Sequence, residues 1–252
     1  MKLLIILVLS LLIPITTTPA QKAPGSPSEV VISFYRELKD KHYIEGFRRS
    51  VYRGAVEGLT AAELQDLEPD FVRTFSAIPD KIESSNEEIS GQTATVSLKF
   101  GGADEIQKVE LVRVGNEWLV GDKDTLGLVN SQGRSFFFNA RMLVNEGEAY
   151  EMLQRIIGAE IIYSRKYEGK NASLPDLIRL GGVPKDIENG EASGYHFSLV
   201  VAADQKSFFA TAIPTSYGKT GKVSFYADIN GVRGEDLKGQ QATVKSNIYQ
   251  PK

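Results

Sequence analysis

Only a few side chains in this 252-residue sequence could act as acids or bases in a reaction. His42 is one of two histidines, and Asp40 precedes it near the end of a predicted helix. An imidazole with a carboxylate such as Asp40 or Asp70 nearby can act as a general base. A histidine in the last turn of a helix more often interacts favourably with the helix dipole. We favour this structural role for His42, so the sequence specifies no reaction.

Asp228 and Asn230 give one short segment the oxygen-rich composition of a calcium-binding loop. The later ligands of an EF-hand are absent, and the Asn-Gly pair that begins at Asn230 is a common hairpin signal, so we predict a turn. His42 and His196 lie far apart in sequence and no cysteine is present, which argues against an ordinary zinc site. Sequence motifs for zinc proteases, dinucleotides, phosphate loops and serine hydrolases are missing as well. We therefore predict no cofactor and no metal.

Five aromatic residues in the first half of the sequence recur at roughly helical spacing: Tyr35, Tyr43, Tyr52, Phe71 and Phe75. Rings at this spacing either line a pocket or complete a hydrophobic core, and the core is the commoner role. We treat all five as candidates for contact with a small apolar ligand.

The elements that must position these residues are helices followed by strands. A capping residue at Ser26, with Pro27 and Glu29 after it, predicts the start of one helix, and Thr60 with Glu63 predicts the start of another. Alternating apolar residues then predict strands at 93–100, 106–114 and 118–120. Helices that precede an antiparallel sheet indicate an α+β fold.

The second half of the sequence repeats the order of a helix and then strands. Apolar residues at helical spacing predict a helix over 145–167, and strand-like segments follow at 195–201, 208–213 and 223–228. Between the halves, residues 123–134 contain Gly127 and Gly133 and few periodic apolar positions, so we interpret them as a linker. The sequence therefore predicts two α+β domains, over 27–122 and 135–252.

A resemblance to a known superfamily is carried by FYREL (34–38), LTAAEL (59–64), PDF (69–71) and NEWLVGD (116–122). Together they resemble the small cone-shaped domains of the nuclear transport factor and ketosteroid isomerase superfamily. The resemblance implies a curved sheet around a helix, with an apolar pocket between them. Many members bind without catalysis, whereas the enzymes place a base and a phenol or second acid inside the cone. On that alternative, His42, Asp40 and Tyr35 would be the catalytic residues.

A second resemblance is carried by NEGEA (145–149), AEIIY (159–163), GYHF (194–197) and SFYADINGVR (224–233). These segments resemble the globular domain of type IV pilins and type II secretion pseudopilins. The resemblance implies a helix packed on an antiparallel sheet. Pilins assemble through a long apolar helix, but residues 136–144 include polar side chains and are too short to span a membrane. We expect no filaments, and we expect a protein partner from the envelope to contact Tyr217, Tyr226 and Arg233.

The N-terminus indicates export from the cytoplasm. Lys2 precedes an apolar run at 3–13, and Ala20 is the small residue that a signal peptidase requires, so residues 1–20 are predicted to be a signal peptide. The run is too short to span a bilayer, and we expect a secreted or periplasmic protein with no stable membrane insertion after processing. The net charge of −3 and the pI of about 5.6 argue against a nucleic-acid partner.

These observations favour a non-enzymatic binding or accessory protein, linked either to a pilus or secretion assembly or to a small apolar ligand. A cone-domain enzyme is the alternative. The geometry of the pocket distinguishes the two classes, because a catalytic cone needs an inward-facing base within reach of a phenol.

Overall fold

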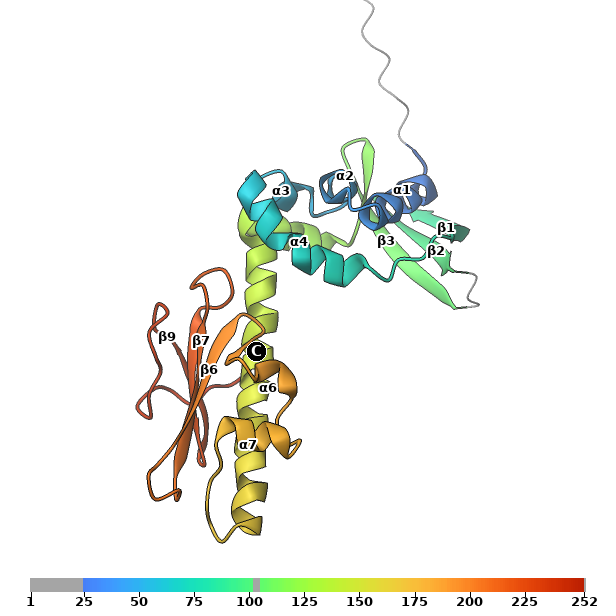
Figure 1. Ribbon diagram of the computed structural model, residues 1–252. Helices are drawn as coiled ribbons and strands as arrows, with labels where there is room; N and C mark the ends of the chain where they lie inside the picture. Colours follow the sequence, from blue (N-terminus) through green and yellow to red (C-terminus); the bar gives the residue numbers. More distant parts are fainter. Residues whose placement is uncertain (1–24, 102–104, 252) are drawn as a thin grey trace, which may run out of the picture.

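The computed structural model describes residues 25–101 and 105–251, which form an α+β fold with two separate antiparallel sheets. The predicted α+β class is confirmed. Figure 1 shows a long upright helix with one sheet beside its lower part, while the N-terminal half extends sideways from its top. The signal peptide predicted at 1–20 lies outside the described residues.

Four helices open the N-terminal half: α1 (Pro27–Lys39), α2 (Tyr43–Arg48), α3 (Arg53–Val56) and α4 (Ala61–Phe75). Both predicted capping boxes are confirmed. The Ser26 side chain accepts a hydrogen bond from the amide of Glu29, and Thr60 does the same for Glu63. Each glutamate reaches back to the amide of its capping residue, so two otherwise unpaired amides are satisfied at each helix start.

The first sheet is a meander in the order β1-β2-β3-β4. It comprises β1 (Ile82–Ser90), β2 (Thr93–Phe100), β3 (Ile106–Val114) and β4 (Glu117–Val120). Alternate residues of β2 and β3, such as Val96, Leu98 and Leu111, have almost no exposed surface and pack with Phe34 and Leu38 of α1. This core holds one face of the sheet against the helices, which is the arrangement that the alternating sequence predicts.

The segment interpreted as a linker is helical, which corrects that part of the sequence interpretation. It forms α5 (Lys123–Gln132), followed by the short 3-10 helix η1 (Gly133–Ser135). Asp122 caps α5 by accepting a hydrogen bond from the amide of Thr125, at 2.7 Å, and Val129 is fully buried. Capping and burial outweigh the low helix propensity of the glycine and polar residues in this segment.

Helix α6 (Phe136–Lys166) belongs to both halves of the molecule. Its 31 residues span about 46 Å at 1.5 Å per residue. Phe138 in its first turns packs into the N-terminal core, while Leu153 and Ile156 pack under the second sheet. The helix predicted over 145–167 is therefore the lower part of a longer one. None of the helices described is long and apolar enough to cross a membrane.

The C-terminal half places α7 (Leu174–Arg179), η2 (Lys185–Ile187) and a five-stranded sheet around the lower part of α6. The strands, in spatial order, are β5 (Glu191–Ala192), β6 (Tyr195–Val201), β7 (Phe208–Pro214), β8 (Val223–Asp228) and β9 (Gly231–Asp236). Asp228 pairs with Gly231, so the predicted hairpin is confirmed, with Ile229 and Asn230 as its turn residues.

An ionic cluster joins the two halves beside α6. Arg141 of α6 donates hydrogen bonds to the carboxylates of Asp66, at 2.8 Å, and Asp70, at 2.6 Å, both on α4. Asp66 also accepts a hydrogen bond of 2.8 Å from Lys219, in the loop between β7 and β8. Burial alone would raise the pKa of Asp66, but the hydrogen bonds from Lys219 and Arg141 outweigh it and lower the pKa. The cluster thus fixes the C-terminal half against α4.

Candidate functional site

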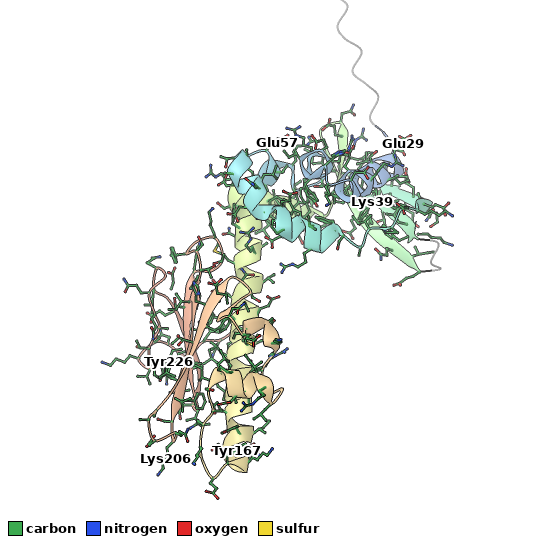
Figure 2. The ribbon with its side chains drawn as sticks, in the orientation of Figure 1. Glu29, Lys39, Glu57, Tyr167, Lys206 and Tyr226 are labelled. Atoms are coloured by element: carbon green, nitrogen blue, oxygen red, sulfur yellow. The ribbon has the colours of Figure 1, made fainter. Side chains whose placement is uncertain are left out.

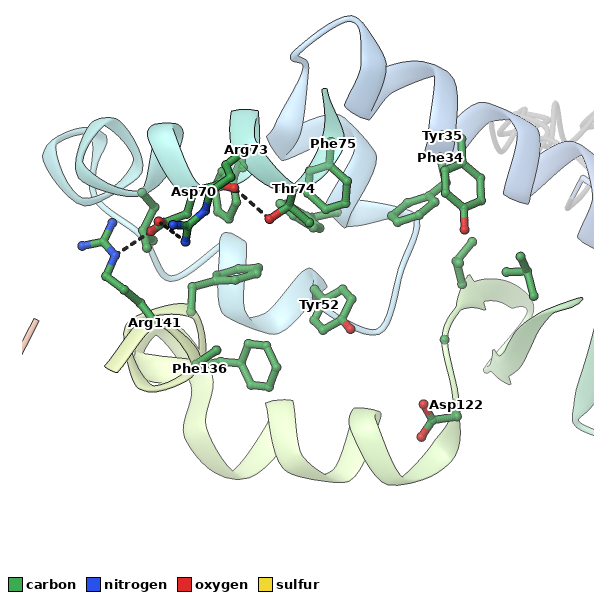
Figure 3. Close-up of a pocket in the computed structure, with 18 of the residues that line it drawn as sticks. Phe34, Tyr35, Tyr52, Asp70, Arg73, Thr74, Phe75, Asp122, Phe136 and Arg141 are labelled. Atoms are coloured by element: carbon green, nitrogen blue, oxygen red, sulfur yellow. Dashed lines mark hydrogen bonds and ion pairs between the residues drawn. The ribbon is translucent and has the colours of Figure 1, made fainter. Parts of the chain in front are cut away.

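A cavity of about 730 Å³ opens where α1, α4, the end of β4 and the first turns of α6 meet. Figure 3 shows side chains from these elements facing a common space. The N-terminal half supplies six aromatic residues to the lining, and α6 adds Phe136 and Phe137; the six are Phe34, Tyr35, Phe47, Tyr52, Phe71 and Phe75. A concave, largely apolar lining with a few polar groups is typical of small-molecule sites.

Three rings in mutual contact form one wall of the cavity. The centroids of Phe47, Phe71 and Phe137 lie 5.0 to 5.1 Å apart in all three pairs. These distances are within the favourable range for aromatic pairs, which adds to the stabilisation from burial. Phe137 comes from α6, so this wall exists only because α6 extends into the N-terminal half.

Charged side chains surround one end of the cavity and pair with one another. Asp70 accepts hydrogen bonds from Arg141 and, at 3.3 Å, from Arg73. The Arg141 side chain is only 10% exposed, and its guanidinium also donates to Asp66. Asp70 and Arg141 therefore form a paired group of opposite charge at this end of the cavity.

Tyr35, Tyr52 and Asp122 supply further polar groups to the lining, away from Asp70 and Arg141 (Figure 3). Both tyrosines are half-buried, and burial is the main reason that the pKa of each phenol is raised. Electrostatic repulsion from Tyr52 raises the pKa of Tyr35 further, and repulsion from Asp122 raises the pKa of Tyr52. The backbone and side-chain hydrogen bonds from Thr125 hold the pKa of Asp122 below its usual range. The phenols are therefore neutral and Asp122 is ionised at neutral pH.

Four of the five aromatic residues proposed from the sequence as ligand contacts line this cavity. They are Tyr35, Tyr52, Phe71 and Phe75. Tyr43 lies behind the wall, buried against Phe71 at 5.2 Å, and is part of the core.

Sequence reasoning missed several residues of the site, namely Phe136, Phe137, Arg141 and Asp122. All of them lie at or beyond the domain boundary predicted after residue 122. The cavity is therefore lined by residues from both predicted domains. The run of three phenylalanines at 136–138 was the available signal, because three consecutive large apolar residues need a core or a cavity to cover them.

The residues proposed for catalysis do not gather at this site. His42 lies at the start of α2 and not in the last turn of a helix, so the structural role predicted for it at a helix C-terminus is wrong. Its ring is largely exposed and contacts Glu37 at 3.0 Å. Asp40 is exposed at the end of α1, and neither side chain lines the cavity. Of the three catalytic candidates, only Tyr35 does.

The residues proposed for partner contact lie on the second sheet. Tyr226 is labelled on this sheet in Figure 2, and its ring stacks on Phe209 at 5.6 Å. Arg233 is the residue opposite Tyr226 in the β8–β9 register. Tyr217 lies further along, where its hydroxyl donates to Asp236 at 3.0 Å. The structure therefore brings Tyr226 and Arg233 together and leaves Tyr217 apart.

The segment considered for calcium binding forms a tight turn in which the Asp228 carboxylate binds the backbone. Asp228 accepts a hydrogen bond of 2.7 Å from the amide of Asn230, as is usual for an aspartate in a tight turn. Over residues 25–101 and 105–251, no three His, Cys, Asp or Glu side chains gather as potential metal ligands.

Comparisons with known proteins found no match for this chain, whether against models of protein families, curated proteins or solved structures. The two resemblances therefore remain expectations from the sequence, and the functional argument depends on the cavity itself.

Proposed function

We propose that this protein is a non-enzymatic binding protein that holds a small apolar ligand in the cavity between its N-terminal half and α6. One observation carries the proposal: aromatic and aliphatic side chains make up most of the cavity lining, and Asp70 and Arg141, charged groups at one end, are paired with each other. Such a lining offers a favourable environment to an apolar molecule, because burial contributes roughly 25 cal/mol per Å² of apolar surface removed from water.

The same geometry argues against the alternative of a cone-domain enzyme. General-base catalysis requires a carboxylate or imidazole within hydrogen-bonding reach of the reacting atom. The ring of His42 lies outside the cavity, and Asp122 uses its two carboxylate oxygens to bind the amide and hydroxyl of Thr125. Glu110, exposed on β3, also lines the cavity and is the carboxylate that remains for the enzyme alternative. We therefore retain binding as the proposal and the enzyme as the alternative.

A second candidate function, contact with a protein partner in the cell envelope, is favoured by the outer face of the second sheet. Val200 is 43% exposed there, beside the stacked pair of Phe209 and Tyr226, and Arg233 lies opposite Tyr226. Aromatic residues and arginine are enriched in protein interfaces. On this proposal the N-terminal half is a cone-like ligand module, and the C-terminal half is a pilin-like contact module.

A cavity-filling substitution tests the leading proposal. Ala140 is exposed on α6 and lines the cavity, so an Ala140→Trp side chain would occupy the entrance without disturbing a buried contact. The probe is N-phenyl-1-naphthylamine, whose fluorescence rises in apolar surroundings. We expect saturable binding to the mature protein and at least a tenfold weaker affinity for Ala140→Trp, which corresponds to about 1.4 kcal/mol.

Ala62→Trp is the matched control, because Ala62 is also exposed on a helix but lies outside the cavity lining. It should bind the probe like the wild-type protein. A wild-type protein that does not bind, or an Ala140→Trp variant that binds equally well, would contradict the proposed function.

A further inference from the structure

We infer that the cavity receives a large apolar side chain from an extended peptide segment of a partner protein, and that the backbone of this segment pairs with the free edge of β3. In the segment, an acidic residue follows the apolar one. This inference rests on the proposed function for the apolar site and adds the kind of partner that carries the apolar group.

The cavity lies beside a strand edge that no described strand covers. β4 pairs with β3 only from Leu111 to Val114, and the amide of Gly121 then donates to the carbonyl of Glu110 at 2.8 Å. From Glu110 back to Ile106, β2 is the only strand paired with β3 in the described structure. An uncovered edge of this kind is a template for another extended chain.

The backbone groups of Lys108 point to this free edge. Arg113 donates its N–H at 2.8 Å to the carbonyl of Gln92, which directly precedes β2, so the backbone of Arg113 faces β2. Alternate residues of an antiparallel strand direct their backbone groups to opposite neighbours, so Lys108 and Ile106 face away from β2. Within the described structure, their N–H and C=O groups have no backbone partner. An added peptide strand binds to such groups through its own backbone.

The free edge and the cavity are contiguous. Lys108, Val109 and Glu110 all line the cavity, and because Lys108 and Glu110 are exposed, the cavity reaches the surface beside this edge. Val109 pairs with the fully buried Val96, so its side chain lies on the face of the sheet that packs against the helices. Directly opposite residues share a face. An apolar residue opposite Val109 would therefore point towards the aromatic rings of the cavity.

Charge specifies the residue that follows. Gly121 already occupies the position opposite Glu110, so Lys108 is the charged residue that an added strand would oppose directly. Lys108 forms no ion pair with the described residues, and Lys99 of β2 is its diagonal neighbour on the same face. These two cations outnumber the carboxylate of Glu110, and opposite charges attract across a strand pair.

The direction of the segment sets the order of its residues. All strand pairs of this sheet are antiparallel, and an added antiparallel strand continues that pattern with slightly better hydrogen bonds than a parallel one. A strand antiparallel to β3 meets Val109 before Lys108. The apolar residue therefore precedes the acidic one.

The peptide acetyl-Trp-Glu-Thr-Val-amide tests the apolar contact, with Trp opposite Val109 and Glu opposite Lys108. Isothermal titration measures its affinity, and displacement of N-phenyl-1-naphthylamine reports entry into the cavity. We expect saturable binding that displaces the dye. Replacement of Trp by Ala in the peptide should weaken binding at least tenfold, because a large buried apolar side chain is lost.

Methylation of single peptide amides tests the strand pairing. The Glu residue of the peptide would exchange hydrogen bonds with Lys108, so an N-methyl group on Glu should weaken binding about fivefold. The Thr residue lies opposite Gln107, where the peptide amide points away from β3, so N-methylation of Thr is the matched control and should have little effect. The amide of Lys108 should also exchange its hydrogen more slowly in the complex.

A charge swap tests the acidic residue. Lys108→Glu should weaken binding of the peptide about threefold or more, and a peptide with Lys in place of Glu should restore the affinity for this variant. Lys206→Glu is the control, because Lys206 is exposed in the C-terminal half and lies outside the cavity lining. It should bind both peptides like the wild-type protein.

The outcomes separate the two proposals. If neither the dye nor the peptide binds, the proposed function and this inference both fail. If the dye binds but the peptide does not, or if the peptide binds without displacing the dye, the proposed function stands and the inference is wrong. Equal affinities of the two N-methylated peptides, or no rescue of Lys108→Glu, also overturn it. A free protein that sediments as a dimer with the Lys108 amide already protected would show that a second copy covers the edge instead.

Discussion

Glu160 is an ionisable residue with no exposed surface, so its pKa shows the effect of burial on a single carboxyl group. One carboxylate oxygen accepts a hydrogen bond from the amide of Ala172 at 2.9 Å, while the other has no hydrogen-bond partner in the described structure. Burial raises the pKa of Glu160 from its ordinary 4.5 to about 7, and the bond from Ala172 only partly opposes that shift. The folded protein therefore binds a proton that the unfolded chain releases.

This shift predicts a pH-dependent loss of stability. A carboxyl whose pKa is raised by folding stabilises the folded state at low pH, and that stability is lost as the pH rises from about 4.5 through 7. Glu160→Gln removes the titration, so the variant should match the wild-type protein at pH 5 and exceed its free energy of unfolding at pH 8 by about 2 kcal/mol.

Urea unfolding at both pH values measures this difference. Glu168→Gln, an exposed position just beyond α6, is the control and should change stability equally little at both pH values. A Glu160→Gln variant that is less stable than the wild-type protein at pH 8 would show that the ionised carboxylate is tolerated.

At the same scale, the sequence indicated the roles of residues only where neighbours in sequence are also neighbours in space. Tyr35, Tyr52, Phe71 and Phe75 were proposed as ligand contacts because their spacing placed them on helix faces, and they do line the cavity. Phe137 was missed because its contacts with Phe47 and Phe71 join segments that lie far apart in sequence. No local pattern encodes such a contact.

At the scale of elements, capping boxes and alternating apolar residues were reliable guides. The strands predicted at 93–100, 106–114 and 223–228 match β2, β3 and β8. β1 was not predicted, because it is an edge strand with nearly all its residues exposed, so its sequence has no apolar alternation. α5 was interpreted as a linker because its stability comes from a cap and a buried valine rather than from propensity.

The cap of α5 can be tested directly. Removal of an N-cap side chain typically costs about 1 kcal/mol, so Asp122→Ala should lower the free energy of unfolding by that amount. It should also make α5 accessible to limited proteolysis, because the Thr125 amide in the first turn of the helix loses its hydrogen-bond acceptor. Asp124→Ala, in the first turn of the same helix and without a capping hydrogen bond, is the matched control and should resist cleavage. Equal proteolysis of both variants would mean that Asp122 does not hold α5 in place.

At the scale of the whole molecule, α6 and the cluster around Arg141 connect two cores that would otherwise be independent. Arg141 donates to Asp66 and Asp70, and Asp66 continues the connection to Lys219 in the C-terminal half. Arg141→Met removes the partner that Asp66 and Asp70 share and leaves them Lys219 and Arg73, respectively. Loss of a hydrogen-bonded charged group at a partly buried site costs about 2 kcal/mol.

We expect calorimetry to show one unfolding transition for the wild-type protein and two for Arg141→Met, because the exposed pair of Asp66 and Lys219 would then be the remaining ion pair between α4 and the C-terminal half in the described structure. Arg155→Met is the control, since Arg155 is exposed on the same helix and makes no ion pair within the described structure. A single transition in Arg141→Met would show that the continuous helix and this remaining pair are sufficient to couple the halves.

The central claim is that the cavity beneath α1 and α4, with α6 as one of its walls, is a ligand site. Nuclear magnetic resonance of the protein with labelled aromatic side chains tests it most directly, during titration with N-phenyl-1-naphthylamine. We predict that resonances of Phe71, Phe75 and Phe137 shift in a saturable way, while those of Phe209 and Tyr226 on the second sheet remain unchanged. Shifts confined to the second sheet, or no saturable shift at the cavity rings, would contradict the account.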